Sequence, residues 1–170
     1  MVTGLTIGKK GYEASEEVMQ HAQTLTTRFQ KEFIALIDKD SEAYDEVFAC
    51  FKLPKATDEE KAARSAAIQE ATRHAALIPM DVARKALEVM PVIADIARLG
   101  NRNAITDACV AMMAARSAVL GALLHVSINL GVLKDKEFVQ GLQAEADRME
   151  QTACRKEKEL LDAVNQDLRV

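Results

Sequence analysis

The first part of the chain places apolar residues at the spacing of an α-helix. They recur three and four positions apart: Val18, Ala22, Leu25, Phe29, Phe33 and Leu36. Polar side chains fill the positions between them, which is the pattern of a helix with one buried face. The polar run 38–41 predicts a break, after which Ser41 caps a short helix that Pro54 ends.

The middle of the chain predicts a second, longer helix. Thr57 and Glu60 form a capping box, in which each side chain satisfies a backbone N–H at the start of the helix. The helical pattern then continues to Gly100, which is typical of the residue that ends a helix. Pro79 and Pro91 lie inside this pattern, and each removes a backbone hydrogen bond. We therefore expect them to kink or divide the helix.

Two more helices are predicted in the last third of the chain. Thr106 or Asp107 is expected to cap a very apolar helix that Gly131 ends, and Asp135 opens the last helix. The last helix has one apolar face. Its other face is predicted to be a solvated charged surface that carries Arg155, Lys156, Lys158 and Glu159.

The apolar stretch 108–133 is long enough to resemble a membrane span. It contains Arg116, His125 and Asn129, which are costly inside lipid. We therefore interpret it as a buried core helix and predict no membrane partner. Inside a core, Arg116 needs a structural ion pair and Asn129 needs a hydrogen-bond partner.

These patterns define an all-α fold. We find no alternating strand pattern and no linker, so residues 1–170 are predicted to form a single domain. Several helices exceed the usual length of about 11–12 residues. We expect an elongated bundle of long antiparallel helices that forms a homodimer, because a thin bundle buries more surface when two copies associate.

Composition and short motifs exclude several functions. The net charge of −4 and the scarcity of aromatic residues argue against nucleic acid as a partner. Three dispersed cysteines and three scattered histidines predict neither a disulfide framework nor a metal site. The run 4–10 lacks the spacing of a phosphate-binding loop. The N-terminus has no signal-peptide pattern, so we expect a cytoplasmic protein.

Four segments, in this order and spacing, resemble the cyclodeaminase domain of formiminotransferase-cyclodeaminase and its stand-alone bacterial relatives, some of which are methenyltetrahydrofolate cyclohydrolases. They are Gly4-Leu5-Thr6-Ile7-Gly8-Lys9-Lys10-Gly11-Tyr12, the stretch 53–64 that begins Leu53-Pro54-Lys55, Pro79 with the helix after it, and 100–130 with Gly100-Asn101-Arg102-Asn103 and Thr106-Asp107. The resemblance extends over nearly the whole chain.

The resemblance implies an all-α, dimeric enzyme of folate one-carbon chemistry. The cyclodeaminase closes 5-formimidoyltetrahydrofolate to 5,10-methenyltetrahydrofolate and releases ammonia, whereas the cyclohydrolase interconverts the methenyl and 10-formyl forms. Both reactions need proton transfers but no metal, cofactor or covalent nucleophile. The implied partners are a folate, which can carry a polyglutamate tail, and a formiminotransferase. The alternative is a non-catalytic helical interaction protein derived from this family.

Asp107 is the first candidate for the acid or base of this chemistry. Partial desolvation of its carboxyl group would raise the pKa toward the working pH. The opposing interpretation is a helix cap, in which free N–H groups and the helix dipole lower the pKa. The choice of the catalytic role depends on the resemblance, which includes Thr106 and Asp107.

Six further candidates are substrate-binding residues under the same resemblance. Lys9 and Lys10 can bind folate carboxylates or protonate leaving ammonia, or they are solvated charges. Asn101 and Asn103 can hydrogen-bond the pterin edge, or they are turn residues. The last two, in the stretch 53–64, are anion contacts or exposed charges: Lys55 and Arg64.

The resemblance also carries one departure. The family usually has an upstream Pro-Gly-Gly-Gly-Ser-type segment that leads into a helix of small residues, and Met1 falls at what resembles the end of that helix. Without the segment we expect part of the folate pocket to be missing and an exposed groove to remain in the bundle.

Overall fold

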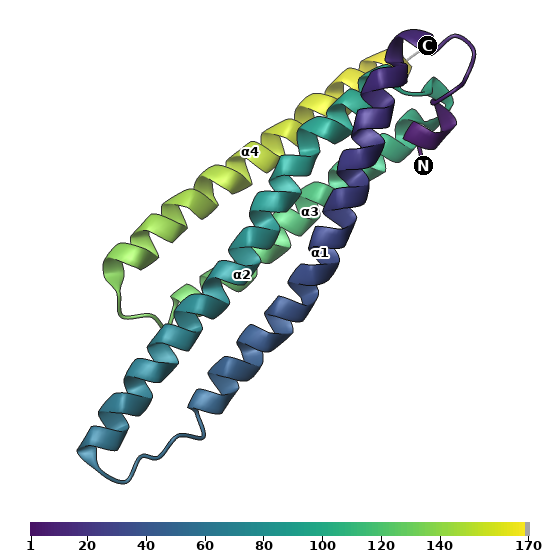
Figure 1. Cartoon of the computed structure of the whole chain (residues 1–170). Helices are drawn as coiled ribbons and strands as arrows, with labels where there is room; N and C mark the ends of the chain where they lie inside the picture. The colour runs from purple at the N-terminus through teal and green to yellow at the C-terminus, as the bar shows by residue number, and fades with distance from the viewer. Residues whose placement is uncertain (169–170) are drawn as a thin grey trace.

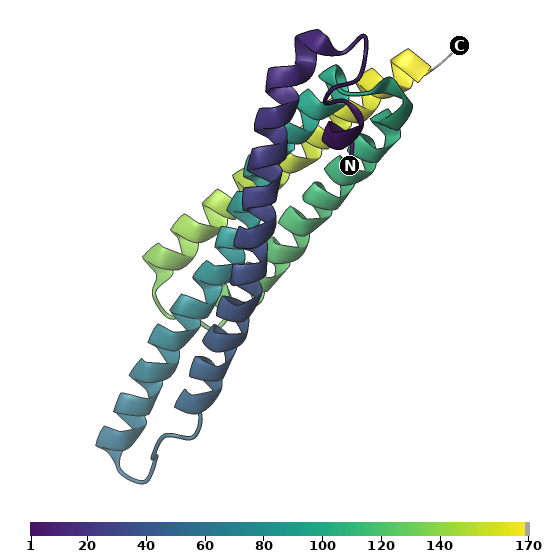
Figure 2. The same cartoon turned by 45° about the vertical axis from the view of Figure 1, so that its right-hand side comes forward.

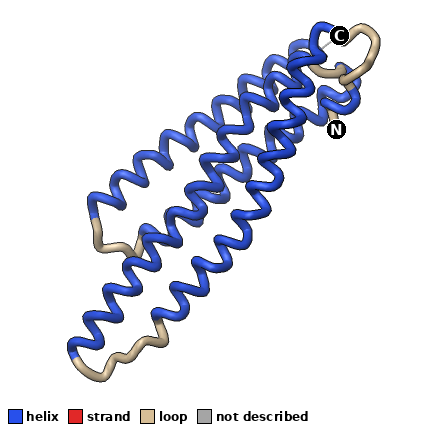
Figure 3. Tube along the Cα trace, in the orientation of Figure 1, coloured by secondary structure: helices blue, strands red, loops and turns tan. Residues whose placement is uncertain are grey.

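The protein is a bundle of four long helices. The structure, a computed structural model, describes residues 1–168. Helices and loops account for all of this part of the chain (Figures 1 and 3). The elements are η1 (Thr3–Leu5), η2 (Glu13–Ser15), α1 (Glu16–Cys50), α2 (Asp58–Leu99), η3 (Arg102–Ala104), α3 (Ile105–Leu130) and α4 (Lys136–Leu168). The all-α prediction is therefore confirmed.

Helix α2 forms the centre of the bundle and packs against each of the other three long helices. Figures 1 and 2 show the elongated shape, with α1 and α4 on different sides of α2. The core is built from small and flexible apolar side chains. Four of its methionines are almost fully buried: Met19, Met80, Met90 and Met112. Alanine lets helices approach closely and methionine fills irregular gaps, which explains how so few aromatic residues suffice.

The predicted break at 38–41 is wrong, because α1 continues through it to Cys50. Leu36 and Ala43 flank the polar run on the same buried face and pack with Ile78 of α2. The four polar residues lie on the exposed part of the helix, where water satisfies their side chains. The Ser41 hydroxyl donates to the Ile37 carbonyl one turn earlier, at 3.1 Å, and caps nothing.

Of the two expected outcomes, a kink or a division, the division does not occur, because α2 is one continuous helix that contains both prolines. Pro79 has no N–H to donate to the carbonyl of Ala75, four residues earlier. That carbonyl instead accepts a hydrogen bond from the Asn129 amide of α3, at 3.2 Å. Pro91 lies on the exposed surface of α2, where water can reach the backbone. The tertiary contact with Asn129 thus compensates for a break that the local sequence predicts.

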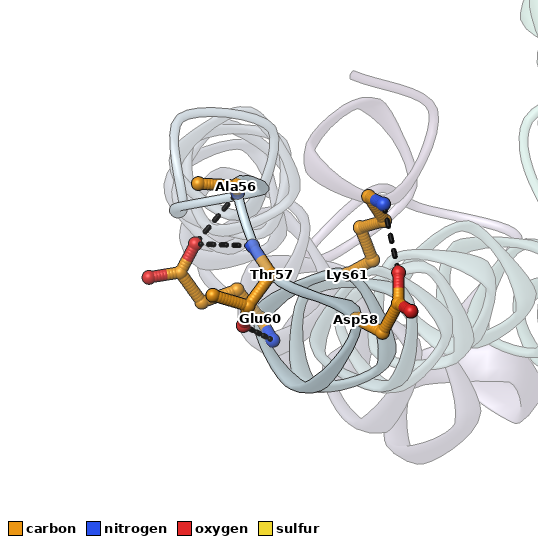
Figure 4. A network of polar contacts seen from close by, with 5 residues as sticks. All are labelled: Ala56, Thr57, Asp58, Glu60 and Lys61. Carbon is orange, nitrogen blue, oxygen red and sulfur yellow. Dashed lines mark hydrogen bonds and ion pairs between the residues drawn. The ribbon is translucent and has the colours of Figure 1, made fainter.

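The capping box at the start of α2 is confirmed (Figure 4). The Glu60 amide donates to the Thr57 hydroxyl at 3.2 Å, and the Glu60 carboxylate accepts from the Thr57 amide at 3.2 Å. Beside it, Lys61 and Asp58 form an ion pair of 2.8 Å. These contacts fix the loop that joins α1 to α2.

Gly100 ends α2 as expected, but for a different reason. Its backbone is extended rather than left-handed, with φ −81° and ψ −179°. A Cβ atom here would lie 2.4 Å from the Ile96 carbonyl oxygen and 3.0 Å from Cγ1 of Val2. The glycine is therefore required by close approach of the chain, not by a positive φ.

Helix α3 begins before the predicted caps. Its N-cap is Ala104, which offers no side-chain bond, so Thr106 and Asp107 lie within the first turn. Gly131 follows its last residue, and the Asp135 carboxylate accepts from the Phe138 amide at 3.1 Å at the start of α4, both as expected.

Only one face of α3 belongs to the core. Leu124 and Ile128 are 71% and 75% exposed, although the helix is apolar nearly throughout. The stretch from Arg102 to Leu130 has the length and composition of a membrane span. Only 33% of its most apolar 18-residue segment is buried in the bundle. The expectation of a core helix therefore holds for the face toward α2 and α4 alone.

Candidate functional site

The N-terminal segment and the α2–α3 connection are joined at one end of the bundle. Thr6 is fully buried there, and its hydroxyl donates to the Val2 carbonyl at 2.8 Å. The same oxygen accepts from the Asn101 amide at 2.9 Å. One side chain thus links two segments that are 95 residues apart in sequence. Sequence reasoning missed Thr6, whose signal was its place inside the first of the four family segments.

Asn101 completes this link with its side chain. Its amide nitrogen donates to the Leu5 carbonyl at 3.1 Å, and its amide oxygen accepts from the Asn103 amide at 3.1 Å. Asn101 is only 6% exposed. Both of its amide atoms are therefore engaged within the protein, where they hold the connection in shape. Asn103, by contrast, is exposed beside it.

The loop after Thr6 presents two lysines to solvent. Gly8 and Gly11 have positive φ angles of 71° and 88°, a conformation that glycine adopts without strain. The Gly11 amide donates to both oxygens of the Glu13 carboxylate, at 3.0 and 2.9 Å, and this lowers the pKa of Glu13. Between these fixed points Lys9 and Lys10 are exposed.

Tyr12 anchors the far end of this loop. Its hydroxyl accepts from the Arg102 amide at 3.1 Å, and the Lys9 ammonium lies 5.5 Å from its ring centroid. Tyr12 was not among the predicted site residues, although it closes the same family segment. Its contacts place Lys9 at the same end of the bundle as the α2–α3 connection.

Asp107 lies at this end, in the first turn of α3. Its side chain is exposed in the single chain. The first backbone N–H groups of a helix have no partners inside the helix, and they favour an anionic group nearby. The structure therefore brings together five of the seven predicted residues at one end of the bundle: Lys9, Lys10, Asn101, Asn103 and Asp107.

Lys55 and Arg64 lie at the opposite end. Arg64 donates to the carbonyl of Phe51 at 3.1 Å and so closes the end of α1, while its guanidinium lies 5.6 Å from the Phe51 ring centroid. Lys55 is exposed in the α1–α2 loop. Since α2 rises about 1.5 Å per residue, Arg64 and the end of α2 are roughly 50 Å apart. Within one chain these two residues do not join the other five.

A cavity of about 680 Å³ lies beside the assembled end, between α2, α4 and the N-terminal segment. Tyr12, Gly100 and Arg102 contribute to its lining, whereas none of the seven predicted residues does. Within residues 1–168 no group of three or more His, Cys, Asp or Glu side chains has the arrangement of a metal site.

The two polar residues of α3 that required partners both have them. Arg116 Nε lies 3.1 Å from a Glu157 carboxylate oxygen, which confirms the expected structural ion pair. The N–H group does not point at that oxygen closely enough to count as a hydrogen bond. Asn129 donates to Ala75, as described above. The Asn129 side chain is thus hydrogen-bonded within the protein, whereas Arg116 has an ion-pair partner but no hydrogen bond at Nε.

The fold and the assembled segments define a helical-bundle protein of the cyclodeaminase type. The sequence profile of the formiminotransferase-cyclodeaminase family matches residues 1–148. The chain therefore belongs to this family, as the resemblance predicted.

Several known proteins are similar to the chain. The methenyltetrahydrofolate cyclohydrolase of Methylorubrum extorquens is 39% identical over 153 residues, which are 86% of this chain and 74% of that protein. The formimidoyltransferase-cyclodeaminase of Rattus norvegicus is 30% identical over 138 residues, which are 81% of this chain but only 26% of that protein. The chain thus spans about a quarter of the rat relative. The crystal structure of formiminotetrahydrofolate cyclodeaminase from Thermotoga maritima has a TM-score of 0.81 and 26% identity, with 96% of this chain and 79% of that chain covered.

Proposed function

We propose that the protein is a tetrahydrofolate one-carbon enzyme that interconverts the 5,10-methenyl and 10-formyl forms. The observation that carries this proposal is the 39% identity to the Methylorubrum extorquens cyclohydrolase over 86% of the chain. The first and fourth family segments, which meet at one end of the bundle, supply a carboxylate, two ammonium groups and a side-chain amide for the reaction.

The proposed reaction adds water to the carbon that bridges N5 and N10. As the new C–O bond forms, one water proton passes to a base, and the carbon becomes tetrahedral. The C–N5 bond then breaks and N5 takes up a proton. The hydroxyl oxygen releases its proton as the C=O bond forms, and the product carries the formyl group on N10. Asp107 is our candidate for the group that accepts and returns the proton. Lys9 and Lys10 would hold the glutamate carboxylates of the substrate as ion pairs.

A second candidate is the cyclodeaminase reaction. In it N10 attacks the formimidoyl carbon on N5, and the tetrahedral intermediate loses ammonia after proton transfer to the leaving nitrogen. The match to the Thermotoga maritima cyclodeaminase over 96% of the chain favours this candidate. Both reactions form a tetrahedral carbon between the same two nitrogens, so one site can serve either.

Lys55 and Arg64 lie at one end of the bundle and the other five predicted residues lie at the opposite end. This separation favours a site that a second copy of the chain completes. We propose a cytoplasmic homodimer of long antiparallel helices, in which Lys55 and Arg64 of one copy approach Asp107 of the other. Contacts such as Arg28 with Glu88 support the antiparallel course of α1 and α2. The exposed apolar face of α3 supports association, because faces of this kind mark interaction surfaces.

The activity is tested by the absorbance of 5,10-methenyltetrahydrofolate. The wild-type chain is expected to consume the methenyl compound by hydrolysis, and Asp107→Asn is expected to slow turnover at least a hundredfold. Glu137→Gln is the matched control, because Glu137 is an exposed carboxylate in the first turn of α4. Release of ammonia from the formimidoyl substrate would identify the cyclodeaminase instead. If neither substrate turns over and calorimetry detects no folate binding, the non-catalytic interaction protein is the better interpretation.

The shared site is tested by mixing two inactive variants. Asp107→Asn and Arg64→Ala chains, unfolded together and refolded, should recover about a quarter of wild-type activity, because half of the dimers are mixed and each mixed dimer has one intact site. Sedimentation equilibrium measures the dimer directly. A monomer at micromolar concentration, or no recovery on mixing, would contradict the two-copy site.

A further inference from the structure

The second half of α1 carries an apolar stripe on its outer surface. Its five large side chains follow one another at spacings of three, four or seven residues, and each is at least 50% exposed: Ile34, Ile37, Tyr44, Phe48 and Phe51. Ser41 fills the remaining position of this repeat. Such spacing keeps a stripe on one side of a helix and is typical of a helix that packs against another helix. Within residues 1–168 no helix covers the stripe.

The outer face of α3 is a second uncovered apolar surface. Its large residues lie at its two ends and are 41–75% exposed: Val110 and Met113 at one end, Leu124 and Ile128 at the other. The exposed residues between them are small: Ala114, Ser117, Ala118 and Gly121. The face is therefore shallow in its middle. At about 1.5 Å per residue, the stripe and this face are both roughly 26 Å long.

The two surfaces complement each other when they run antiparallel. Ile34 of one copy then meets Ile128 of the other, and Phe51 falls at the start of the α3 face. Between these ends Tyr44 and Phe48, whose stacked rings have centroids 6.3 Å apart, lie over the small residues. Large rings against a shallow surface allow the close packing that stable interfaces need.

Charge favours this pairing over one of stripe with stripe. Asp38, Asp40 and Asp45 lie next to the stripe along α1. In an antiparallel pair of stripes Asp40 of one copy would face Asp45 of the other, and like charges beside an apolar seam disfavour pairing. Helix α3 has no acidic residue after Asp107, so its outer face presents no like charge to these aspartates.

The same pairing brings Arg64 to Asp107. Arg64 lies at one end of the stripe, where its guanidinium donates to the Phe51 carbonyl at 3.1 Å. Asp107 lies one turn before Val110, at the end of the α3 face that Phe51 meets. Antiparallel pairing therefore places Arg64 of one copy beside Asp107 of the other.

Contacts with α2 show that one two-fold axis can make both contacts. The Glu46–His74 ion pair, at 2.9 Å, places the centre of the stripe beside about residue 77 of α2. The Asn129–Ala75 hydrogen bond places the centre of the α3 face beside about residue 85. An axis midway between these levels seats each stripe on the other copy's α3. Pairing of like surfaces would instead separate the arginine from the carboxylate by more than about 10 Å along the bundle.

We propose that the stripe of α1 docks on the outer face of α3 in a second copy of the chain, twice across a two-fold axis. This register determines which residues of the second copy complete the site. The interface itself does not depend on the reaction, whereas its role in catalysis rests on the proposed function.

The register is tested with single cysteines in a chain that lacks the native ones, through Cys50→Ser, Cys109→Ala and Cys154→Ser. Ser41 and Gly121 lie one heptad inside the contact of Ile34 with Ile128, so they face each other across the interface. Gly121 has open space for a side chain. Ser41→Cys and Gly121→Cys chains, unfolded together and refolded, should give a covalent dimer with a short bis-maleimide. Neither variant alone should, because each cysteine meets its own copy only when like helices pair.

The docking surface is tested by sedimentation equilibrium. Phe48→Glu should raise the dissociation constant of the dimer at least about a hundredfold, because each dimer loses two central aromatic anchors. Ala35→Glu is the matched control, because Ala35 is exposed on the other flank of α1, and it should leave the dimer unchanged. Both positions are exposed in the single chain, so circular dichroism should show both variants folded.

Three results would overturn the inference. They are a monomeric wild-type chain, a covalent dimer of either cysteine variant alone with none in the mixture, and a Phe48→Glu chain that dimerises as well as Ala35→Glu. None of these measurements needs turnover. A monomer that consumes the methenyl compound would contradict the interface and leave the proposed function intact. A dimer that crosslinks as expected but turns over neither folate would do the reverse.

Discussion

The hydrogen bond from Asn129 to Ala75 allows a direct test of how α2 stays continuous across Pro79. The perturbation is Asn129→Leu, which removes the amide and keeps a similar volume. In the native chain the Ala75 carbonyl has no helical donor, because Pro79 lacks an N–H. Its side-chain donor is Asn129, at 3.2 Å. The substitution therefore leaves a partly buried carbonyl without a protein partner.

The size of the effect follows from the burial of these groups. A buried polar group that loses its partner costs about 1–3 kcal/mol. Ala75 and Asn129 are both half-buried, so we expect about 1–2 kcal/mol of lost stability. When Pro79 is replaced by alanine, residue 79 gains an N–H that can donate to Ala75. In that background Asn129→Leu should cost only a few tenths of a kcal/mol.

The assay is a double-mutant cycle by urea denaturation, followed by circular dichroism at 222 nm. Four chains are compared: wild type, Asn129→Leu, Pro79→Ala and the double variant. The expected coupling free energy is about 1 kcal/mol, since the two substitutions act on one carbonyl. The single Pro79→Ala variant also loses ring packing, and the cycle cancels this contribution.

Additive effects of the two substitutions, within about 0.3 kcal/mol, would refute the reasoning. The matched control is Pro91→Ala combined with Asn129→Leu. Pro91 is one of the two prolines inside α2, but it lies twelve residues beyond Pro79 and does not share the Ala75 carbonyl. This second pair should be additive. Coupling in both pairs would indicate a general change of the helix rather than the proposed hydrogen bond.

Three further predictions concern stability, all measured by urea denaturation. Thr6→Val should cost about 1–3 kcal/mol, because it leaves the buried Asn101 amide without an acceptor, while the Val2 carbonyl keeps the Leu5 amide as a donor. A loss under about 0.5 kcal/mol would contradict the link. Gly100→Ala should destabilise the protein by more than about 1 kcal/mol, because its Cβ would meet a carbonyl oxygen. Gly141→Ala should stabilise it by about 0.5–1 kcal/mol, because the space around this residue of α4 is open. Changes in unfolding free energy of the same sign for both variants would be inconsistent with this reasoning. Arg84 holds the pKa of Glu145 below 4.5 through hydrogen bonds of 2.7 and 2.8 Å. The stabilisation is thus present above the unfolded pKa and lost as pH falls through the folded pKa. The Arg84 and Glu145 side chains are 42% and 32% exposed, so Glu145→Gln should cost only about 0.5–1 kcal/mol at pH 7. The same variant should lose less stability than wild type as the pH falls below about 4.5. An unchanged dependence of stability on pH in this range would disprove the assignment.

Helix boundaries that depend on local chemistry were predictable from the sequence. The capping box at Thr57, the end of α3 at Gly131 and the start of α4 at Asp135 all involve residues a few positions apart. The predictions that failed depend on distant partners. The run 38–41 stays helical because α2 holds the buried residues on both sides of it. Similarly, Pro79 is tolerated because α3 supplies a donor, and no local pattern contains that information.

In the candidate site, too, some features were predictable from the sequence, whereas contacts between distant residues were not. The family segments were recognised from their order. The first and the fourth meet at one end of the bundle, whereas the second lies at the opposite end. The contacts that hold them were not predictable residue by residue. Thr6 and Asn101 are 95 residues apart, and nothing in their immediate neighbours marks them as partners. Lys156 illustrates the opposite error, because a charged neighbourhood predicted full solvation for a side chain that lies half-buried on a cavity wall.

Helix α3 has an apolar outer face that the single chain leaves exposed. A helix that is apolar on all sides is usually buried on all sides. In the bundle α3 packs against α2 and α4, and its outer face still carries Val110, Leu124 and Ile128 in exposed positions. None of the four helices covers that face, so the proposed second copy is our candidate for covering it. Because Lys55 and Arg64 also lie about 50 Å from the residues they are expected to join, a second copy would resolve both observations with one interface. The mixing experiment therefore tests the packing of the helix and the composition of the site together.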